Sequence, residues 1–212
     1  MANPPDWLGP VIDAVRTPGP VPFLVPRADD AEQLREAAVL VLFGEGPTGP
    51  DVLLLQRAAD LRAHAGQPAF PGGRIDPTDD GPVDAALREA HEETGLDPAG
   101  VVVIGTLPEL WIPPSGNVVT PVVGWWRKAS EVGAVDPAEV EAVARVPISE
   151  LVDPANRLMV RLPIGKDSPA FRVAGMLVWG FTAGVLSWLL ALTGWEREWD
   201  RSVVEPMPGT RS

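Results

Sequence analysis

The sequence predicts an α/β fold, because segments of strand character flank one strongly patterned helix within a single chain of domain size. Residues 36–43 form a continuous apolar run suited to a buried strand. Residues 51–56 follow after a short turn, which predicts a hairpin. A helix is predicted over residues 82–94, and further strands over residues 101–106 and 118–126. A sheet and helices in this order are typical of α/β architectures.

The length of 212 residues suits one domain with short appendages. We expect a short helix and a proline-rich arm in residues 1–30, a single folded domain in residues 31–198, and a mobile tail in residues 199–212. Within these parts, further segments have individual predictions: a helix at 6–16, an extended arm at 17–27, a proline-broken loop at 107–117, a loop and strand at 136–146, and a short helix at 147–153. Pro121 predicts that strand 118–126 lies at a sheet edge or contains a bulge.

Composition excludes several functional classes. The net charge of −12 argues against a general surface for nucleic acid or anionic membranes. Because there is no cysteine, a disulfide, a thiol nucleophile and a cysteine zinc site are all excluded. The N-terminus has no basic region followed by a long apolar core, so we expect no secretory signal and predict a cytoplasmic location.

The predicted helix 82–94 gathers acidic side chains on one face. At roughly 100° per residue, Glu89, Glu92 and Glu93 fall within one arc, which we expect to point away from the core. The opposite side carries small and aliphatic groups: Val83, Leu87, Ala90 and Thr94. Gly95 is the expected left-handed cap.

Three carboxylates so close together need a partner. Two of them lie in the last helical turn, where the helix dipole disfavours negative charge. Arg88 can hold Glu92 four residues away, but one guanidinium cannot neutralise three carboxylates. A hard divalent cation such as Mg²⁺ can, since it takes carboxylate oxygens as ligands. The alternative is a solvated acidic face. His91 projects about 160° away from Glu93 and is therefore interpreted as structural.

The residues R-E-A-H-E-E-T-G-L at 88–96, preceded by Gly72 and Gly73, resemble the Nudix box. The resemblance implies an α/β/α sandwich with a mixed sheet and a loop–helix–loop box, and pyrophosphohydrolase activity. It also implies Mg²⁺ or Mn²⁺ held by Glu89, Glu92, Glu93 and the Gly73 carbonyl, with Arg88 orienting the carboxylates. Two departures exist: aspartate (Asp79 or Asp80) replaces the early glutamate, and the distance from Gly73 to Arg88 is one residue longer.

Residues 53–73 contain a second pattern, L-L-x-x-R-x-x-x-L-R-x-H-x-G-Q-x-x-F-P-G-G, which resembles the coenzyme A pyrophosphatase branch of the Nudix hydrolases. Pieces of the same branch recur between about residues 37 and 124. The resemblance implies a set of substrate-binding residues: Arg57, Arg62, His64, Gln67, Ser115 and Gly116. From chemistry alone, Arg57, Arg62 and His64 are equally well read as solvated loop residues.

Residues 173–195 contain no charge and are long enough to span a bilayer. Thr182 is the expected N-cap that divides a strand at 174–179 from a helix of about eleven residues, too short to cross a bilayer. We therefore predict no membrane insertion. The helix carries exposed apolar positions that predict burial against a second subunit, and hence a homodimer: Trp188, Leu189 and Leu192.

Three functional hypotheses follow. The first is metal-dependent hydrolysis of coenzyme A or its derivatives to 3′,5′-ADP and (acyl-)4′-phosphopantetheine. The second is hydrolysis of another nucleoside diphosphate derivative, such as ADP-ribose or NADH. The third is a catalytically silent binding or regulatory module, suggested by the aspartate at position 79 or 80 and the longer spacing. Glu139 is a further acidic candidate without an assigned role.

Overall fold

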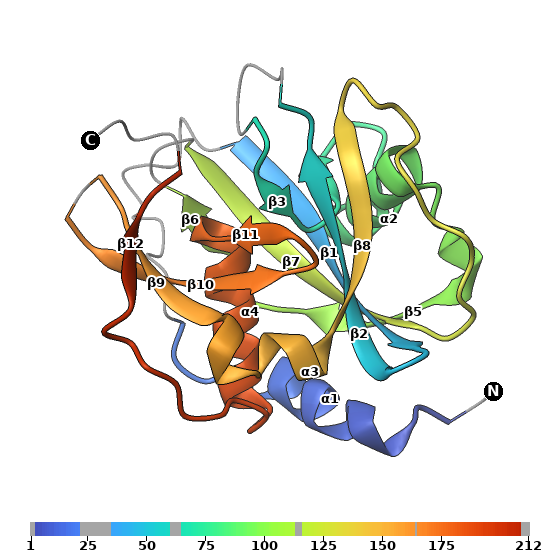
Figure 1. Cartoon of the computed structure of the whole chain (residues 1–212). Helices are drawn as coiled ribbons and strands as arrows, with labels where there is room; N and C mark the ends of the chain where they lie inside the picture. The colour runs from blue at the N-terminus through green and yellow to red at the C-terminus, as the bar shows by residue number, and fades with distance from the viewer. Residues whose placement is uncertain (1–2, 22–34, 60–64, 113–115, 164, 209–212) are drawn as a thin grey trace.

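The computed structural model describes residues 3–21, 35–59, 65–112, 116–163 and 165–208. Within these residues the main sheet has eight strands (Figure 1): β1 (Arg35–Gly46), β2 (Gly49–Arg57), β3 (Pro68–Ala69), β4 (Gly72–Arg74), β5 (Val101–Thr106), β6 (Leu110–Ile112), β7 (Asn117–Trp126) and β8 (Val140–Pro147). The strands β1 and β7 pair in parallel, and the other neighbours in this sheet pair antiparallel. The predicted mixed sheet and the hairpin of β1 and β2 are therefore confirmed.

The hairpin of β1 and β2 opens toward one end of the sheet. The two strands pair only from Phe43 with Val52 to the turn. Beyond that point, β4 pairs with β1 and β3 pairs with β2, so residues 68–74 fill the space between the diverging strands. This arrangement carries Gly72 and Gly73 into the sheet beside the acidic helix.

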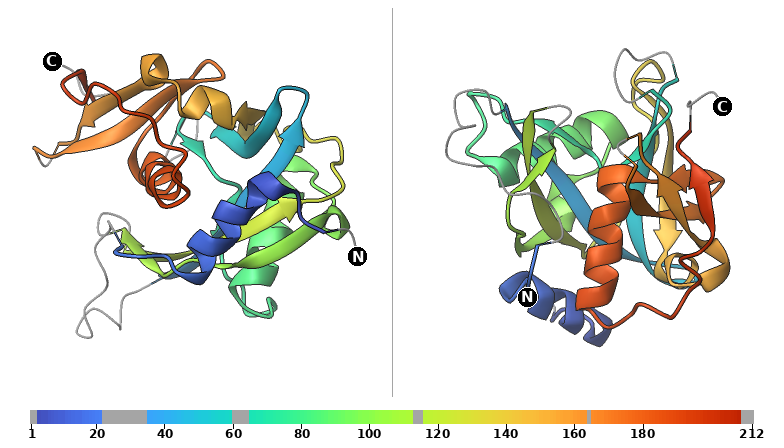
Figure 2. Two further views of the ribbon diagram at one scale, coloured as in Figure 1. Left: turned by 90° about the horizontal axis from the view of Figure 1, so that it is seen from below. Right: turned by 90° about the vertical axis from the view of Figure 1, so that its left-hand side faces the viewer.

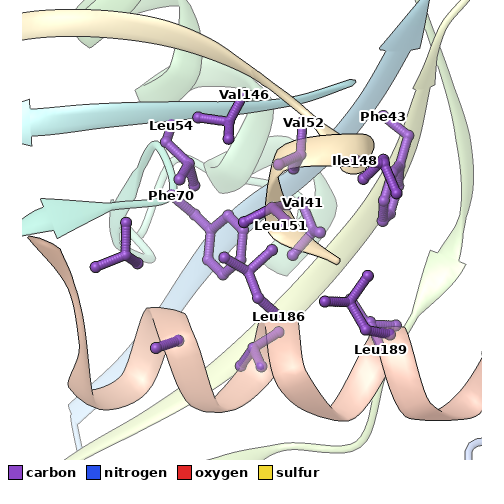
Figure 3. Close-up of a cluster of buried hydrophobic side chains, with 14 of the residues drawn as sticks. Val41, Phe43, Val52, Leu54, Phe70, Val146, Ile148, Leu151, Leu186 and Leu189 are labelled. Carbon is purple, nitrogen blue, oxygen red and sulfur yellow. The ribbon is translucent and has the colours of Figure 1, made fainter. Parts of the chain in front are cut away.

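Helices cover both faces of the sheet (Figures 1 and 2), as the α/β/α prediction requires. On one face lies α2 (Pro82–Thr94), and on the other lie α1 (Gly9–Arg16), α3 (Ile148–Leu151) and α4 (Gly180–Leu192). Alternate residues of β1 supply the two cores: Leu40 and Leu42 pack with the alanines of α2, and Val41 and Phe43 pack toward α4 (Figure 3). Short 3-10 turns complete the helical elements: Asp6–Leu8, Pro98–Gly100 and Pro154–Asn156.

The prediction that the strand at Pro121 lies at a sheet edge or contains a bulge is wrong. The register shift between β5 and β7 falls between Val103 and Gly105, in β5. The strand β7 lies between β1 on one side and β5 and β6 on the other. The Pro121 carbonyl accepts a hydrogen bond from the Leu107 N–H at 2.9 Å. Within an antiparallel strand the nitrogen and carbonyl of one residue face the same neighbour, so the Pro121 nitrogen faces the gap between β5 and β6. In the described part of the chain, no strand in this gap requires an N–H from residue 121, and proline is therefore tolerated inside the sheet. The strand β6 also corrects the prediction of a proline-broken loop over residues 107–117, since residues 110–112 of that segment are a strand.

A second sheet follows the main one, and the sequence predicted only one of its strands, at residues 174–179. Its strands, in the order β11-β10-β9-β12, are β9 (Arg157–Arg161), β10 (Asp167–Val173), β11 (Met176–Val178) and β12 (Val204–Pro206). Because β12 pairs with β9, the prediction of a mobile tail from residue 199 is corrected for residues 199–206. Residues 209–212 lie outside the described residues, as does the predicted arm from residue 22 onward.

The uncharged segment 173–195 forms the turn after β10, then β11 and α4. The helix begins at Gly180 after the N-cap Trp179, so the prediction that Thr182 is the N-cap is wrong. Among the described residues, no helix is long and apolar enough to cross a membrane. Trp188 and Leu189 are buried within this chain, and Leu192 packs partly buried against the same core, so most of the apolar surface on which the homodimer prediction depended is covered. The oligomeric state itself remains a prediction.

Candidate active site

The helix α2 has the predicted bounds. Pro82 occupies its first turn, and Gly95, with φ of 70°, ends it by donating its N–H to the His91 carbonyl at 2.9 Å. The prediction that all three glutamates point away from the core is wrong for Glu93, which is only 7% exposed. Of the predicted core-facing stripe, Ala90 and Thr94 are buried, and Val83 and Leu87 pack partly buried against the core. Ala85 and Ala86, which the sequence did not assign to the stripe, are buried as well.

Glu93 is a buried carboxylate with two polar neighbours. The Gly72 N–H donates to Glu93 Oε2 at 2.9 Å, and Arg57 Nη1 lies 3.6 Å from Glu93 Oε1. Burial raises the pKa of Glu93 to about 7, although the Gly72 N–H and Arg57 oppose the rise. The structure thus brings Arg57 to the acidic cluster, whereas the sequence indicated only a contact with substrate.

Arg88 organises the exposed side of the cluster. Its Nε and Nη2 bind Asp79 in a two-pronged pair at 2.9 and 3.0 Å, while Nη1 donates to Glu89 at 3.1 Å and to Glu92 at 3.0 Å. The hydrogen bond to Arg88 lowers the pKa of Asp79. Of the two aspartates considered for the early acidic position, Asp79 is the one that anchors Arg88. The shorter side chain and the longer spacing still deliver a carboxylate to the arginine.

The backbone leaves no space for a side chain at Gly72, since a Cβ there would overlap the Ala38 carbonyl and Val39. A Cβ on Gly73 would overlap the Glu89 carboxylate, which is the end of a flexible side chain and can move aside. Burial also raises the pKa of Glu89, against the opposing effect of Arg88. Glu89 thus lies directly against the Gly72–Gly73 turn, where the sequence analysis placed a metal ligand.

The donor set fits a hard divalent cation in its chemistry. Glu89 and Glu93 are carboxylates withdrawn from water at a turn that has no side chain of its own. In the part of the chain that the structure describes, no three acidic or histidine side chains already converge as a metal site. The carboxylates are paired with Arg88 and Arg57 instead. A bound cation would have to compete with these two guanidinium groups for the same oxygens.

The predicted substrate residues are only partly visible. The backbone carbonyl of Gln67 accepts the backbone N–H of Arg57 at 3.1 Å, and the Arg57 side chain reaches Glu93 in the acidic cluster. Gly116 has φ of 66° in the turn between β6 and β7, and its carbonyl accepts the Arg35 N–H at 3.1 Å. This gives Gly116 a backbone role and leaves its substrate contact a prediction. Three predicted residues lie outside the described residues: Arg62, His64 and Ser115.

Two further residues near α2 have clear positions. The backbone carbonyl of Glu139 accepts a hydrogen bond from the Ala58 N–H at 2.9 Å. The negative charge of the Glu139 side chain contributes to the raised pKa of Glu93. The sequence marked Glu139 as acidic but could not place it beside Glu93. His91 Nδ1 lies 2.8 Å from the Leu96 carbonyl, so that nitrogen carries the proton and donates it. The structural role predicted for His91 is confirmed.

Comparison with known proteins decides the family. The model of the NUDIX domain matches residues 33–163. The chain belongs to the Nudix hydrolase family. It is 40% identical to the "Uncharacterized Nudix hydrolase NudL" of Pectobacterium atrosepticum over 168 residues, covering 77% of this chain and 85% of that protein. A NudL protein of Escherichia coli strain K12 is 40% identical over 157 residues, covering 72% of this chain and 79% of the relative.

A solved Nudix hydrolase shows the same fold. The Nudix hydrolase RenU of M. smegmatis superposes with a TM-score of 0.54 at 23% identity, over 79% of this chain and 91% of that one. The α/β/α Nudix fold predicted from the sequence is therefore confirmed, and the chain is an enzyme of the pyrophosphohydrolase class. The loop, helix and loop of the Nudix box are the segment from Gly72 through α2 to Gly95.

Proposed function

We propose that this Nudix hydrolase cleaves the diphosphate linkage of coenzyme A or its derivatives, giving 3′,5′-ADP and (acyl-)4′-phosphopantetheine. We propose Mg²⁺ or Mn²⁺ as its cofactor. Glu89, Glu92 and Glu93 would hold the cation, together with the Gly73 carbonyl. When bound, the cation would neutralise charge on the diphosphate and lower the pKa of a water molecule.

One observation supports the coenzyme A substrate above others. The pattern that resembles the coenzyme A branch ends in Gly72 and Gly73. Its Arg57 lies 3.6 Å from Glu93, to which the Gly72 N–H donates, and the Gln67 backbone carbonyl holds the Arg57 backbone N–H. A substrate held by this segment therefore has its diphosphate next to the carboxylates. The remaining residues proposed for substrate binding are Arg62, His64, Ser115 and Gly116.

The chain's own residues have separable tasks in this proposal. Arg88, fixed by Asp79, orients Glu89 and Glu92. The Gly72 N–H orients Glu93, and Arg57 offers a positive charge at the inner side of the site. A guanidinium in this position suits a phosphate group. With two anionic phosphates next to a protein of net charge −12, such local cations are needed to bind the substrate.

The test is product analysis with a panel of substrates. Purified protein is incubated with coenzyme A, acetyl-coenzyme A, ADP-ribose and NADH, each with Mg²⁺ or Mn²⁺, and the products are identified by mass. We expect 3′,5′-ADP and 4′-phosphopantetheine from coenzyme A. Preferential cleavage of ADP-ribose or NADH would instead support the second hypothesis. An absence of turnover on the whole panel with either metal would overturn the proposed substrate range.

Matched variants connect the activity to the acidic cluster. We expect Glu93→Gln to lower kcat for the best substrate by at least about a hundredfold, because the site loses an oxygen ligand and a charge. The control is Glu150→Gln, the same change at an exposed position on α3. Equal activity of the two variants would contradict the assigned site.

A further inference from the structure

The chain beyond residue 163, which the family model does not match, touches the segment that leads into the glycine turn. Thr182, the third residue of α4, is 6% exposed, and its hydroxyl donates to the Pro68 carbonyl at 3.2 Å. A threonine in the first turn of a helix commonly serves that helix as a cap. Here the N-cap position belongs to Trp179, and the Thr182 hydroxyl is directed to another element.

The Pro68 carbonyl needs this partner. The carbonyl of Gln67 faces β2, where it accepts the Arg57 N–H. Successive carbonyls along a strand point to opposite sides, so the Pro68 carbonyl points away from β2 and toward α4. A buried carbonyl without a donor is costly, and Thr182 supplies that donor from α4.

A short, well-anchored path connects Pro68 to the carboxylates. Phe70 is 3% exposed and lies beside Leu151 and Leu186 in the core (Figure 3). The next residue, Pro71, accepts the Leu40 N–H at 2.8 Å. Gly72 then donates its N–H to Glu93. The helix α4 therefore fixes the start of the segment whose end orients a catalytic carboxylate.

We propose that Thr182 is a positioning residue of the hydrolase: through Pro68 it sets the path of residues 68–73, and thereby the place of the Gly72 N–H and of Glu93. The inference rests on the proposed metal site at Glu89 and Glu93 and not on the identity of the substrate. In this proposal α4 positions residues of the active site in addition to packing in the core.

The test compares Thr182→Val with Thr182→Ser and with Thr193→Val. Valine keeps the shape of threonine and removes the hydroxyl, while serine keeps the hydroxyl. Thr193, the C-cap of α4, is a matched control, because in the described residues its hydroxyl bonds only to the carbonyls of Leu189 and Leu190 in that helix. The readouts are the Mn²⁺ dissociation constant from electron paramagnetic resonance and the deuterium uptake of peptides that span residues 68–73.

We expect Thr182→Val to raise the Mn²⁺ dissociation constant about 3- to 10-fold. Removing a residue that bonds directly to a metal ligand typically weakens metal binding more than this. Deuterium uptake of residues 68–73 should rise in the same variant. Thr182→Ser and Thr193→Val should both behave like the unaltered protein. If Thr182→Val does not fold, Thr182→Ser against Thr182→Ala gives the same comparison of a hydroxyl present and absent.

The outcomes separate this inference from the proposed metal site. Unchanged Mn²⁺ affinity and unchanged uptake in folded Thr182→Val would overturn the positioning role, as would a serine variant that behaves like valine. If the unaltered protein itself bound no Mn²⁺, the proposed metal site would fail. Deuterium uptake would then still decide whether Thr182 orders residues 68–73.

Discussion

Glu93 is a residue whose burial costs the fold stability. Its carboxylate is buried, and its two polar neighbours, the Gly72 N–H and Arg57, offset only part of the cost of burying a charge. Its pKa is about 7 in the folded protein, against an ordinary value of 4.5. A group whose pKa is raised on folding destabilises the folded state wherever it is forced to ionise.

This raised pKa predicts how stability changes with pH in the metal-free protein. Below pH 4.5 the group is neutral in both states and carries no cost, and the cost grows as the pH rises from 4.5 to 7. We therefore expect Glu93→Gln to be more stable than the unaltered protein at pH 8, by up to about 3 kcal/mol, and much less so at pH 5. Urea unfolding in EDTA at both pH values measures the difference. Glu150→Gln should show no such trend, and an equal effect of Glu93→Gln at both pH values would contradict the prediction.

Gly73 lies close to the Glu89 carboxylate, and a side chain at this position would displace it. The backbone would not have to move, because that carboxylate is the end of a flexible side chain. The sequence could connect Gly73 with Glu89 only through the motif, since no local pattern reports a distance between two elements.

At the scale of elements, the hairpin of β10 and β11 contains a backbone conformation that suits its residue poorly. Val173 pairs with Met176, so Ala174 and Gly175 make the two-residue turn. Both have positive φ, 50° for Ala174 and 75° for Gly175. Two-residue turns of this kind match the twist of a hairpin, but the left-handed conformation is costly for alanine.

We expect Ala174→Gly to stabilise the protein by about 0.5–1 kcal/mol, because glycine removes the strain of the left-handed conformation. The control is Ala191→Gly at an exposed position near the end of α4, where the same change should destabilise by up to about 1 kcal/mol. Urea unfolding of both variants gives the signs. A loss of stability in Ala174→Gly would show that the turn does not strain the alanine.

At the scale of the whole molecule, Arg157 joins the part matched by the family model to the C-terminal part. It lies on β9, and its side chain is 1% exposed between the rings of Phe171 and Trp199, each 4.4 Å from the guanidinium carbon. Its Nη2 lies 3.1 Å from Ser187 Oγ and 3.3 Å from Glu196 Oε1. All these partners come after residue 163, so one side chain connects β9, β10, α4 and the segment before β12.

We expect Arg157→Ala to destabilise the protein by about 2–4 kcal/mol, because Glu196 loses its ion-pair partner and the rings of Phe171 and Trp199 lose the guanidinium that packs between them. The matched control is Arg161→Ala on the same strand. Arg161 is 58% exposed and pairs with Asp167 at the surface, so its loss should cost about 0–1 kcal/mol. Equal losses in urea unfolding would contradict the role of Arg157 as the central connection.

The elements that the sequence predicted well are those with local signals. The helix α2 has a proline in its first turn, a small-residue stripe and a capping glycine, all within its own length, and both its bounds were predicted. The tail was predicted poorly for the converse reason. The strand β12 is three residues long and depends on pairing with β9, and no pattern within residues 204–206 reports that partner.

By itself, the sequence determined the Nudix family, the α/β class, the acidic helix and its capping glycine, because each is carried by residues close together in the chain. Only the tertiary structure decided which carboxylate is buried, that Asp79 anchors Arg88, that Arg57 and Glu139 lie near Glu93, and that Thr182 reaches Pro68. These contacts join segments far apart in sequence. Their energy depends on distance and burial, and both are set only when the sheet and helices pack together.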